Sequence, residues 1–175
     1  MLNKLMVIIV PILLFLLQQS FLTAAPLFFP YINLILIYCI SLLIIVNADF
    51  ALYNTLFFGI LSDVYSPNLF GLYTISLMFS IFLAHIFLRQ LFTNRSIYTF
   101  IFLTIIATLS FQLCHQIILL TANIFTMRTT FSVFFSQRYF LSMLYENIAN
   151  VVVISIIFYV VNYFSFKLKT FFIKI

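Results

Sequence analysis

Apolar segments long enough to cross a lipid bilayer follow one another along most of this chain. The run INLILIYCISLLIIV, for example, is apolar at nearly every position, whereas a strand of a membrane β-barrel alternates apolar and polar residues. Hydrophobic residues make up 66% of the 175 residues and charged residues only 6%, far from the ~25% charged residues of an ordinary soluble domain. The sequence therefore predicts an all-α integral membrane protein with no room for a soluble domain.

Polar interruptions divide the chain into six hydrophobic segments. Each crossing takes ~20 residues, so the sequence predicts a single membrane domain over residues 1–175, built as a six-helix transmembrane bundle. Its helix count is similar to that of transporter substrate-binding subunits. The expected spans are about residues 5–22, 31–46, 47–65, 69–88, 97–121 and 141–164.

The third span is unusually polar. Its apolar part, residues 50–62, rises only ~20 Å as a helix. The segment is therefore either re-entrant, or it crosses by including the polar residues Asn47, Asp49, Asn54 and Asp63. Polar side chains are tolerated at membrane depth where neighbouring helices shield them from lipid. We therefore expect this segment to face protein and not lipid.

The first segment resembles a secretory signal peptide, because Lys4 precedes its apolar run and Thr23-Ala24-Ala25 follows it. Pro26, directly after the candidate cleavage site, argues against cleavage there. Five further apolar segments follow. We therefore interpret residues 5–22 as a retained first span.

Basic residues mark the cytoplasmic side of membrane proteins. With six crossings, the side that holds the N terminus carries most of the Lys and Arg residues, which predicts that both termini are cytoplasmic. The cations lie singly between spans and form no stripe of the kind that binds nucleic acid. They are Lys4, Arg89, Arg95, Lys167, Lys169 and Lys174 on the first side, and Arg128 and Arg138 on the other.

The longest connection, residues 122–140, lies on the expected outer side. Met127 and Arg138 belong to a set of residues that recurs at helical spacing and includes three phenylalanines. The pattern predicts an interfacial helix on the outer leaflet, a docking surface for a partner, or both. The phenylalanines are Phe131, Phe134 and Phe135.

The only two glycines, Gly59 and Gly71, flank an acid, Asp63, within the stretch GILSDVYSPNLFG. Gly59 and Asp63 are four residues apart and share a helix face, so the glycine lets another helix approach beside the carboxylate. Ser66 and Pro67 predict the N-cap and first position of the next helix. Gly71 would then lie one turn inside that helix, at a second close contact. The stretch predicts a tight helical hairpin in which Asp63 accepts hydrogen bonds from the following turn.

The run FFGILSDVYSPNLFGLYTI resembles the signature of the rod-shape-determining protein MreD family: a glycine, a few apolar residues, an aspartate, a turn, and a second glycine before an apolar helix. Gly59, Asp63 and Gly71 occupy these positions, and Pro67 lies in the turn, where the family usually carries glycine. Upstream, PYINLILIYCISLLIIVNADFALYNTLFFG is similar to the family's second span and short third span. The resemblance covers about residues 26–95.

The resemblance implies a non-enzymatic membrane scaffold subunit of the bacterial cell-elongation machinery, without a cofactor, in the cytoplasmic membrane. The implied partners are a single-span protein like MreC, the actin-like MreB filaments, and the peptidoglycan polymerase RodA with its transpeptidase. Lipid surrounds the spans. We expect Asp63 to act structurally, so that Asp63→Asn keeps most of the function and Asp63→Leu loses it.

Polar residues in the outer half of the fifth and sixth spans form a second candidate site. Glu146 is a carboxylate within a span, where it is costly, so we expect it to bond to His115 or to a glutamine. The cluster has two interpretations, a structural polar clasp or a ligand site. Its residues are Gln112, His115, Gln116, Glu146 and Asn150, with Asn147 beside them.

Metal-ligand residue types do not combine into a predicted metal site. His85 and His115 lie at different depths, and Cys114 points about 100° away from its neighbour His115 on a helix. Cys39 and Cys114 lie within spans and are predicted to be free thiols.

Two alternatives to a scaffold remain. The chain could be the substrate-binding subunit of a vitamin-type small-molecule transporter, with the outer polar cluster as its pocket. An intramembrane enzyme is disfavoured, because no serine–histidine, paired-aspartate or zinc spacing lies at one depth.

Overall fold

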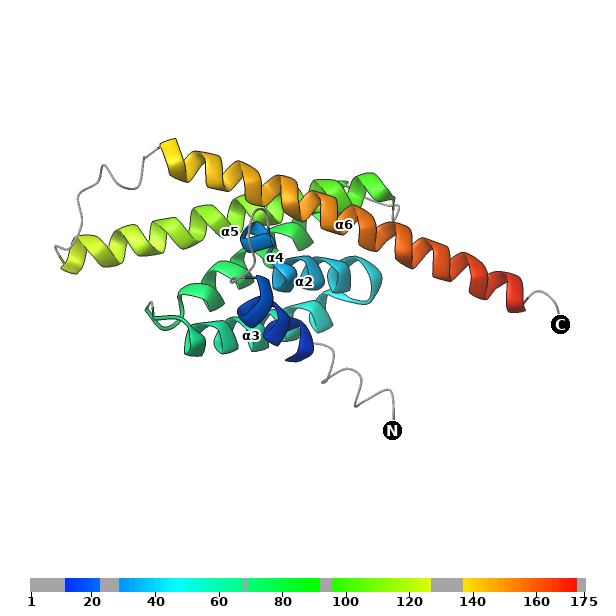
Figure 1. The fold of residues 1–175 in the computed structure, drawn as a ribbon, viewed down its shortest axis with the longest axis horizontal. Helices are drawn as coiled ribbons and strands as arrows, with labels where there is room; N and C mark the ends of the chain where they lie inside the picture. The colour runs from blue at the N-terminus through cyan, green and yellow to red at the C-terminus, as the bar shows by residue number, and fades with distance from the viewer. Residues whose placement is uncertain (1–11, 23–28, 68, 92–95, 127–136, 173–175) are drawn as a thin grey trace.

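The computed structural model describes residues 12–22, 29–67, 69–91, 96–126 and 137–172. Within these ranges every regular element is a helix (Figure 1). Residues 12–16 are α-helical and continue into the π-helical η1. The elements are η1 (Leu17–Leu22), the short 3-10 helix η2 (Phe29–Tyr31), α2 (Leu34–Ile45), α3 (Ala48–Tyr65), α4 (Leu72–Leu91), α5 (Ile97–Thr126) and α6 (Gln137–Phe172).

The second to sixth predicted spans overlap α2 to α6 in order, although α5 and α6 extend beyond the predicted bounds. Three segments are long and apolar enough to cross a membrane: Leu72–Leu91, Ile97–Ala122 and Phe140–Val160. By contrast, α2 has 12 residues and rises about 18 Å. With 18 residues α3 rises about 27 Å, but it is more polar. Length and composition therefore support a membrane protein through α4, α5 and α6.

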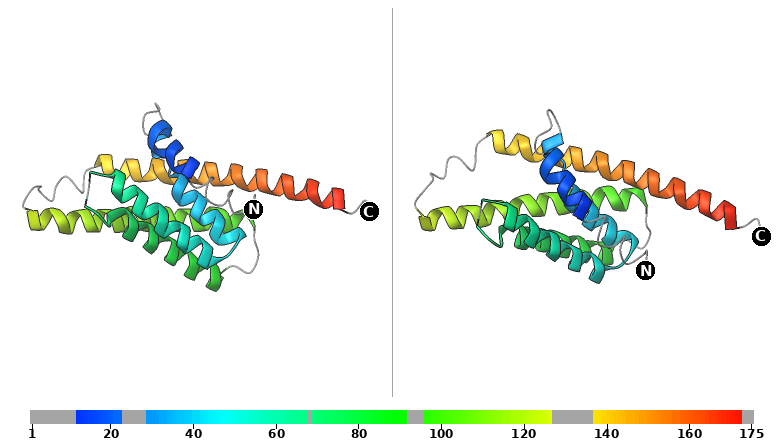
Figure 2. Two further views of the ribbon diagram at one scale, coloured as in Figure 1. Left: turned by 90° about the horizontal axis from the view of Figure 1, so that it is seen from below. Right: turned by 60° about the horizontal axis from the view of Figure 1, so that its bottom comes forward.

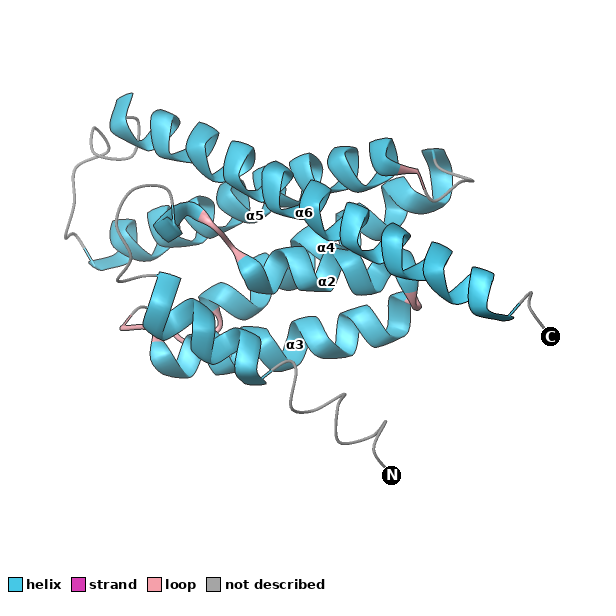
Figure 3. Cartoon of the chain, turned by 45° about the vertical axis from the view of Figure 1, so that its right-hand side comes forward, coloured by secondary structure: helices cyan, strands magenta, loops and turns pink. Residues whose placement is uncertain are grey.

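The core of the bundle surrounds α2, which contacts α3, α4, α5 and α6. Figure 3 shows α2 between α3 and the pair formed by α5 and α6. Leu36, Cys39 and Ile40 are completely buried, as expected of a helix that is apolar on all sides. Phe58 of α3 and Leu103 of α5 are equally buried on either side of it.

The two longest helices, α5 and α6, pack against each other, and α6 continues beyond the bundle at its C-terminal end (Figure 2). In α6 large apolar side chains are exposed from its first described side chain, Phe140, to Tyr163 near the projecting end. Apolar surface of this extent on a helix fits contact with a membrane or with partner proteins.

The expectation that α3 faces only protein is wrong for one of its two faces. Asp63 is buried, as predicted, and so are Thr55 and Ser62, but Asp49 is exposed, contrary to the expectation. The opposite face is apolar and exposed, because helical periodicity places a row of large side chains there. This row consists of Tyr53, Leu56, Phe57, Ile60 and Val64.

The predicted start of the fourth helix at Pro67 is also wrong, since α4 begins at Leu72. Ser66 is the C-cap of α3, and its backbone N–H donates to the Ser62 carbonyl at 3.0 Å. The backbone of Ser66 is extended, the conformation that a following proline favours. Pro67 therefore terminates α3 and does not initiate α4.

The interfacial helix predicted within residues 122–140 has its centre, residues 127–136, outside the described residues. The flanking positions 122–126 continue α5, and positions 137–140 begin α6. Of the eight basic residues that predict the topology, the structure describes the side chain of Arg89 in the last turn of α4.

Candidate functional site

Asp63 binds the N-terminal end of α4 from the last turn of α3. Its Oδ1 accepts a hydrogen bond from the Tyr73 backbone N–H at 2.8 Å, and its Oδ2 accepts from the Thr74 backbone N–H at 3.1 Å. The Thr74 hydroxyl also donates to Oδ2. The first N–H groups of a helix have no partner within the helix, so the Asp63 carboxylate caps α4 from another element.

Gly59 lies one turn before Asp63 and faces the same residue of α4. A Cβ atom built on Gly59 would lie 2.6 Å from the Cα atom of Thr74, closer than real Cβ contacts. The close approach predicted at Gly59 is therefore confirmed. Because the obstacle is a backbone atom, no rotation of a side chain would make room for a larger residue.

Gly71 has a different role from the one predicted. It precedes α4 and has a φ of +96°, a backbone conformation that favours glycine. A Cβ atom there would meet only the Ile75 Cδ1 atom, at 3.8 Å, an ordinary contact distance. Gly71 is thus required for the turn into α4, and the predicted second close contact is absent.

The polar cluster joins α6 to α5 and α2. Gln112 of α5 donates a hydrogen bond to the Glu146 carboxylate, so the predicted bond between Glu146 and a glutamine is confirmed. Asn150 is completely buried and accepts from the Asn33 backbone N–H at 2.9 Å. Its side-chain amide donates to the Thr108 hydroxyl at 3.4 Å. Asn150 therefore acts as a structural clasp between three helices.

His115 does not bond to Glu146. Its ring packs edge-on against the Tyr73 ring, with centroids 5.1 Å apart, and lies 5.8 Å from the Phe111 ring. The Nε2 atom of His115 and the Oε1 atom of Gln116 are both buried, and neither has a hydrogen-bond partner among the described residues. The cluster therefore retains hydrogen-bonding capacity that the protein does not use.

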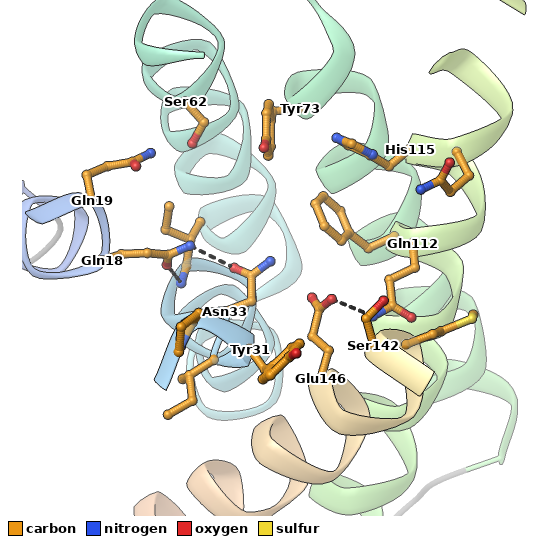
Figure 4. A pocket seen from close by; sticks show the side chains of 16 residues that line it. Gln18, Gln19, Tyr31, Asn33, Ser62, Tyr73, Gln112, His115, Ser142 and Glu146 are labelled. Atoms are coloured by element: carbon orange, nitrogen blue, oxygen red, sulfur yellow. Dashed lines mark hydrogen bonds between the residues drawn. The ribbon is translucent and has the colours of Figure 1, made fainter. Parts of the chain in front are cut away.

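These residues line a cavity of about 310 Å³ between the N-terminal segment, the hairpin and the α5–α6 pair. Figure 4 shows Glu146 and Tyr31 reaching into this space, with Gln18 and Asn33 opposite Gln112. The lining includes Gln18, Gln19, Tyr31, Asn33, Ser62, Tyr73, Gln112, His115, Gln116, Ser142, Met143 and Glu146.

The N-terminal wall of the cavity was not predicted from the sequence. Gln18 accepts a hydrogen bond from the Ile35 backbone N–H at 2.9 Å, and Asn33 accepts from the Leu36 N–H at 3.2 Å. Together they cap α2. Asn33 carries a recognisable signal, since an asparagine directly before an apolar run marks a helix N-cap. Gln18 and Gln19 form a polar pair within an otherwise apolar segment.

The hairpin and the cavity share Tyr73. Its backbone N–H donates to Asp63, whereas its ring packs on His115 and lines the cavity. Ser62, next to Asp63 in α3, also lines the cavity. The capped start of α4 is therefore one wall of the polar cavity.

No group of three or more His, Cys, Asp or Glu side chains within the described ranges could hold a metal ion. Cys39 is buried and Cys114 is half-buried, and both are free thiols, as predicted. Comparisons of the chain with models of protein families, with curated proteins and with solved structures found no match. Proposals about function therefore rest on the residues, their geometry and the resemblance in the hairpin.

Proposed function

We propose that this chain is a non-enzymatic scaffold subunit of the bacterial cell-elongation complex, which directs peptidoglycan synthesis in rod-shaped cells. In this proposal the chain is a six-helix bundle in the cytoplasmic membrane, with both termini in the cytoplasm. The observation that carries the proposal is that Gly59, Asp63 and Gly71, the three signature residues, all shape one contact between α3 and α4.

The chemistry of this contact favours a structural role. Asp63 is only 3% exposed, and α4 donates hydrogen bonds to both of its carboxylate oxygens. Gly59 and Gly71 provide space and a backbone turn, and neither carries a reactive group. A signature made of such residues specifies a rigid hairpin, which a scaffold needs in order to hold its partners at fixed positions.

The outer surface of the hairpin is suited to contacts within a membrane. The apolar row on α3 is exposed, and on α4, Ile75, Phe79 and Phe82 are also exposed. Helices in a bilayer associate by close van der Waals packing of such surfaces. The proposed partners are membrane lipid, an MreC-like single-span protein, and the peptidoglycan polymerase with its transpeptidase.

Co-purification in mild detergent from the native host tests the scaffold proposal. We expect the tagged chain to recover a single-span coiled-coil protein and a cell-wall polymerase. The Asp63→Leu variant, compared at equal membrane abundance, should recover less of both, because α4 loses its cap. Recovery of ATPase subunits in place of these partners would contradict the scaffold.

A second candidate function is the substrate-binding subunit of a small-molecule transporter. The observation that favours it is the polar cavity, whose 310 Å³ lies at the lower end of the ~300–1,000 Å³ of small-molecule sites. A scaffold has no evident need for such a cavity. Uptake of a radiolabelled compound that depends on this chain and on ATP would support the transporter.

A further inference from the structure

We propose that the polar cavity binds an organic ammonium group, which pairs with the Glu146 carboxylate. The group belongs either to a small soluble amine or to the amine headgroup of a lipid. The inference rests on the cavity and its lining, and it is independent of the scaffold proposal.

The size of the cavity indicates a molecule larger than a few ordered waters. The volume of about 310 Å³ lies at the lower end of the ~300–1,000 Å³ of small-molecule sites. A bare metal ion would leave most of this space unfilled, and its ligands are lacking among the described residues. The volume therefore fits a small organic group.

The charge of the lining selects a cation. Glu146 is the only carboxylate among the described lining residues, and no lysine or arginine is among them. The second acid nearby, Asp63, is engaged by the first turn of α4. Gln112 donates one hydrogen bond to Glu146 but carries no charge. A half-buried carboxylate at membrane depth without a positive partner is costly, and a bound cation would reduce that cost.

The remaining lining fits an ammonium group that carries several N–H donors. Tyr31 and Tyr73 present aromatic rings, which attract cations at their faces. The amide oxygen of Gln116 has no hydrogen-bond partner in the part of the chain that the structure describes, and an ammonium group donates up to three hydrogen bonds. An anion would be repelled by Glu146, and a neutral ligand would leave its charge unpaired.

Thermal unfolding of the full chain in detergent tests the soluble source. We use ethanolamine and propylamine as probes, and ethylene glycol and 1-propanol as their uncharged counterparts. At least one cation should raise Tm in a saturable manner, and its counterpart should not. Glu146→Gln, which keeps an amide able to bond Gln112, should abolish the shift. Asp49→Asn, which removes an exposed acid on α3, should leave the shift unchanged.

Reconstitution tests the lipid source. Here Tm is compared in nanodiscs of phosphatidylethanolamine and of phosphatidylglycerol, and only the first lipid should stabilise the wild type relative to Glu146→Gln. If neither the soluble amines nor the amine lipid stabilises the wild type, or if Glu146→Gln responds equally, the proposal is wrong.

A second variant covers the case in which Glu146→Gln does not fold. Met143 lines the cavity one turn before Glu146 on α6, so Met143→Lys places an ammonium group beside the carboxylate. This variant should fold and lose its response to added amines, because the cavity already holds a cation. A Met143→Lys protein that responds to amines like the wild type would contradict the proposal.

Discussion

Thr74 of α4 is the residue that both Gly59 and Asp63 of α3 contact. Gly59 leaves space for its Cα atom, while Asp63 binds its backbone N–H and its hydroxyl. The steric and the polar requirement thus act on one point of α4. Substitutions at either partner are expected to weaken the same contact for different reasons.

Asp63→Leu should destabilise the protein far more than Asp63→Asn. Leucine leaves the backbone N–H groups of Tyr73 and Thr74 without a partner, at about 1–3 kcal/mol each. Asparagine keeps one carbonyl acceptor, so its cost should be about 1–2 kcal/mol, in the range of a weakened helix cap. Thermal unfolding in detergent measures both values, and complementation of rod shape should follow the same order. The matched control is Asp49→Leu, which changes an exposed acid. Equal stability of the two Asp63 variants would contradict the capping role.

The two glycines should respond differently to asparagine. Gly59→Ala should cost about 1–3 kcal/mol through overlap with the Thr74 backbone, and Gly59→Asn should cost more. Gly71→Ala should cost about 1–2 kcal/mol through its positive φ, but Gly71→Asn should be milder, since asparagine tolerates this region. Unfolding free energies of the four variants check this reversal. The same order of alanine and asparagine at both positions would contradict the separate roles.

At the scale of elements, hydrogen bonds between distant segments decide how α6 is held. Asn150 bonds to the backbone at Asn33, 117 positions away, and to Thr108 of α5. The α6 surface is otherwise largely apolar and exposed, so it offers little specificity for one orientation against its neighbours. A few polar contacts therefore set the position of α6 against α2 and α5.

Asn150→Leu should weaken this attachment while keeping a side chain of similar size. The Asn33 backbone N–H would lose its partner, which costs about 1–3 kcal/mol. Asn54→Leu is the control, because the Asn54 amide bonds to the Phe50 carbonyl of its own helix. Crosslinking of cysteines placed in α2 and α6 should fall in Asn150→Leu and stay unchanged in Asn54→Leu. Normal crosslinking and stability of Asn150→Leu would show that the clasp is dispensable.

At the scale of the whole molecule, the distribution of Lys and Arg predicts the orientation in the membrane. Six of the eight basic residues lie on the side of the N terminus when the chain crosses six times. Reporter fusions at both termini should therefore show cytoplasmic activity. An alkaline phosphatase fused to the C terminus and active in the periplasm would contradict both the six crossings and the orientation.

The sequence by itself determined the helices and the membrane character of the chain. Both follow from local properties, namely runs of apolar residues, their lengths and the polar interruptions between them. The close approach at Gly59 was predictable for the same reason, since helical spacing alone puts it on the face of Asp63. The bond from Gln112 to Glu146 followed from the cost of an unpaired acid within a span.

Only the tertiary structure decided which residues of α4 donate to Asp63, why Gly71 is a glycine, and which residues complete the polar cavity. A φ value depends on how the whole turn closes, so Gly71 looked like a packing residue when only spacing was known. Gln18 and Asn33 reach the cavity through contacts with segments far along the chain, such as the bond from Asn33 to Asn150. A local sequence pattern does not indicate which distant residues come into contact, because these contacts form only when the helices have packed.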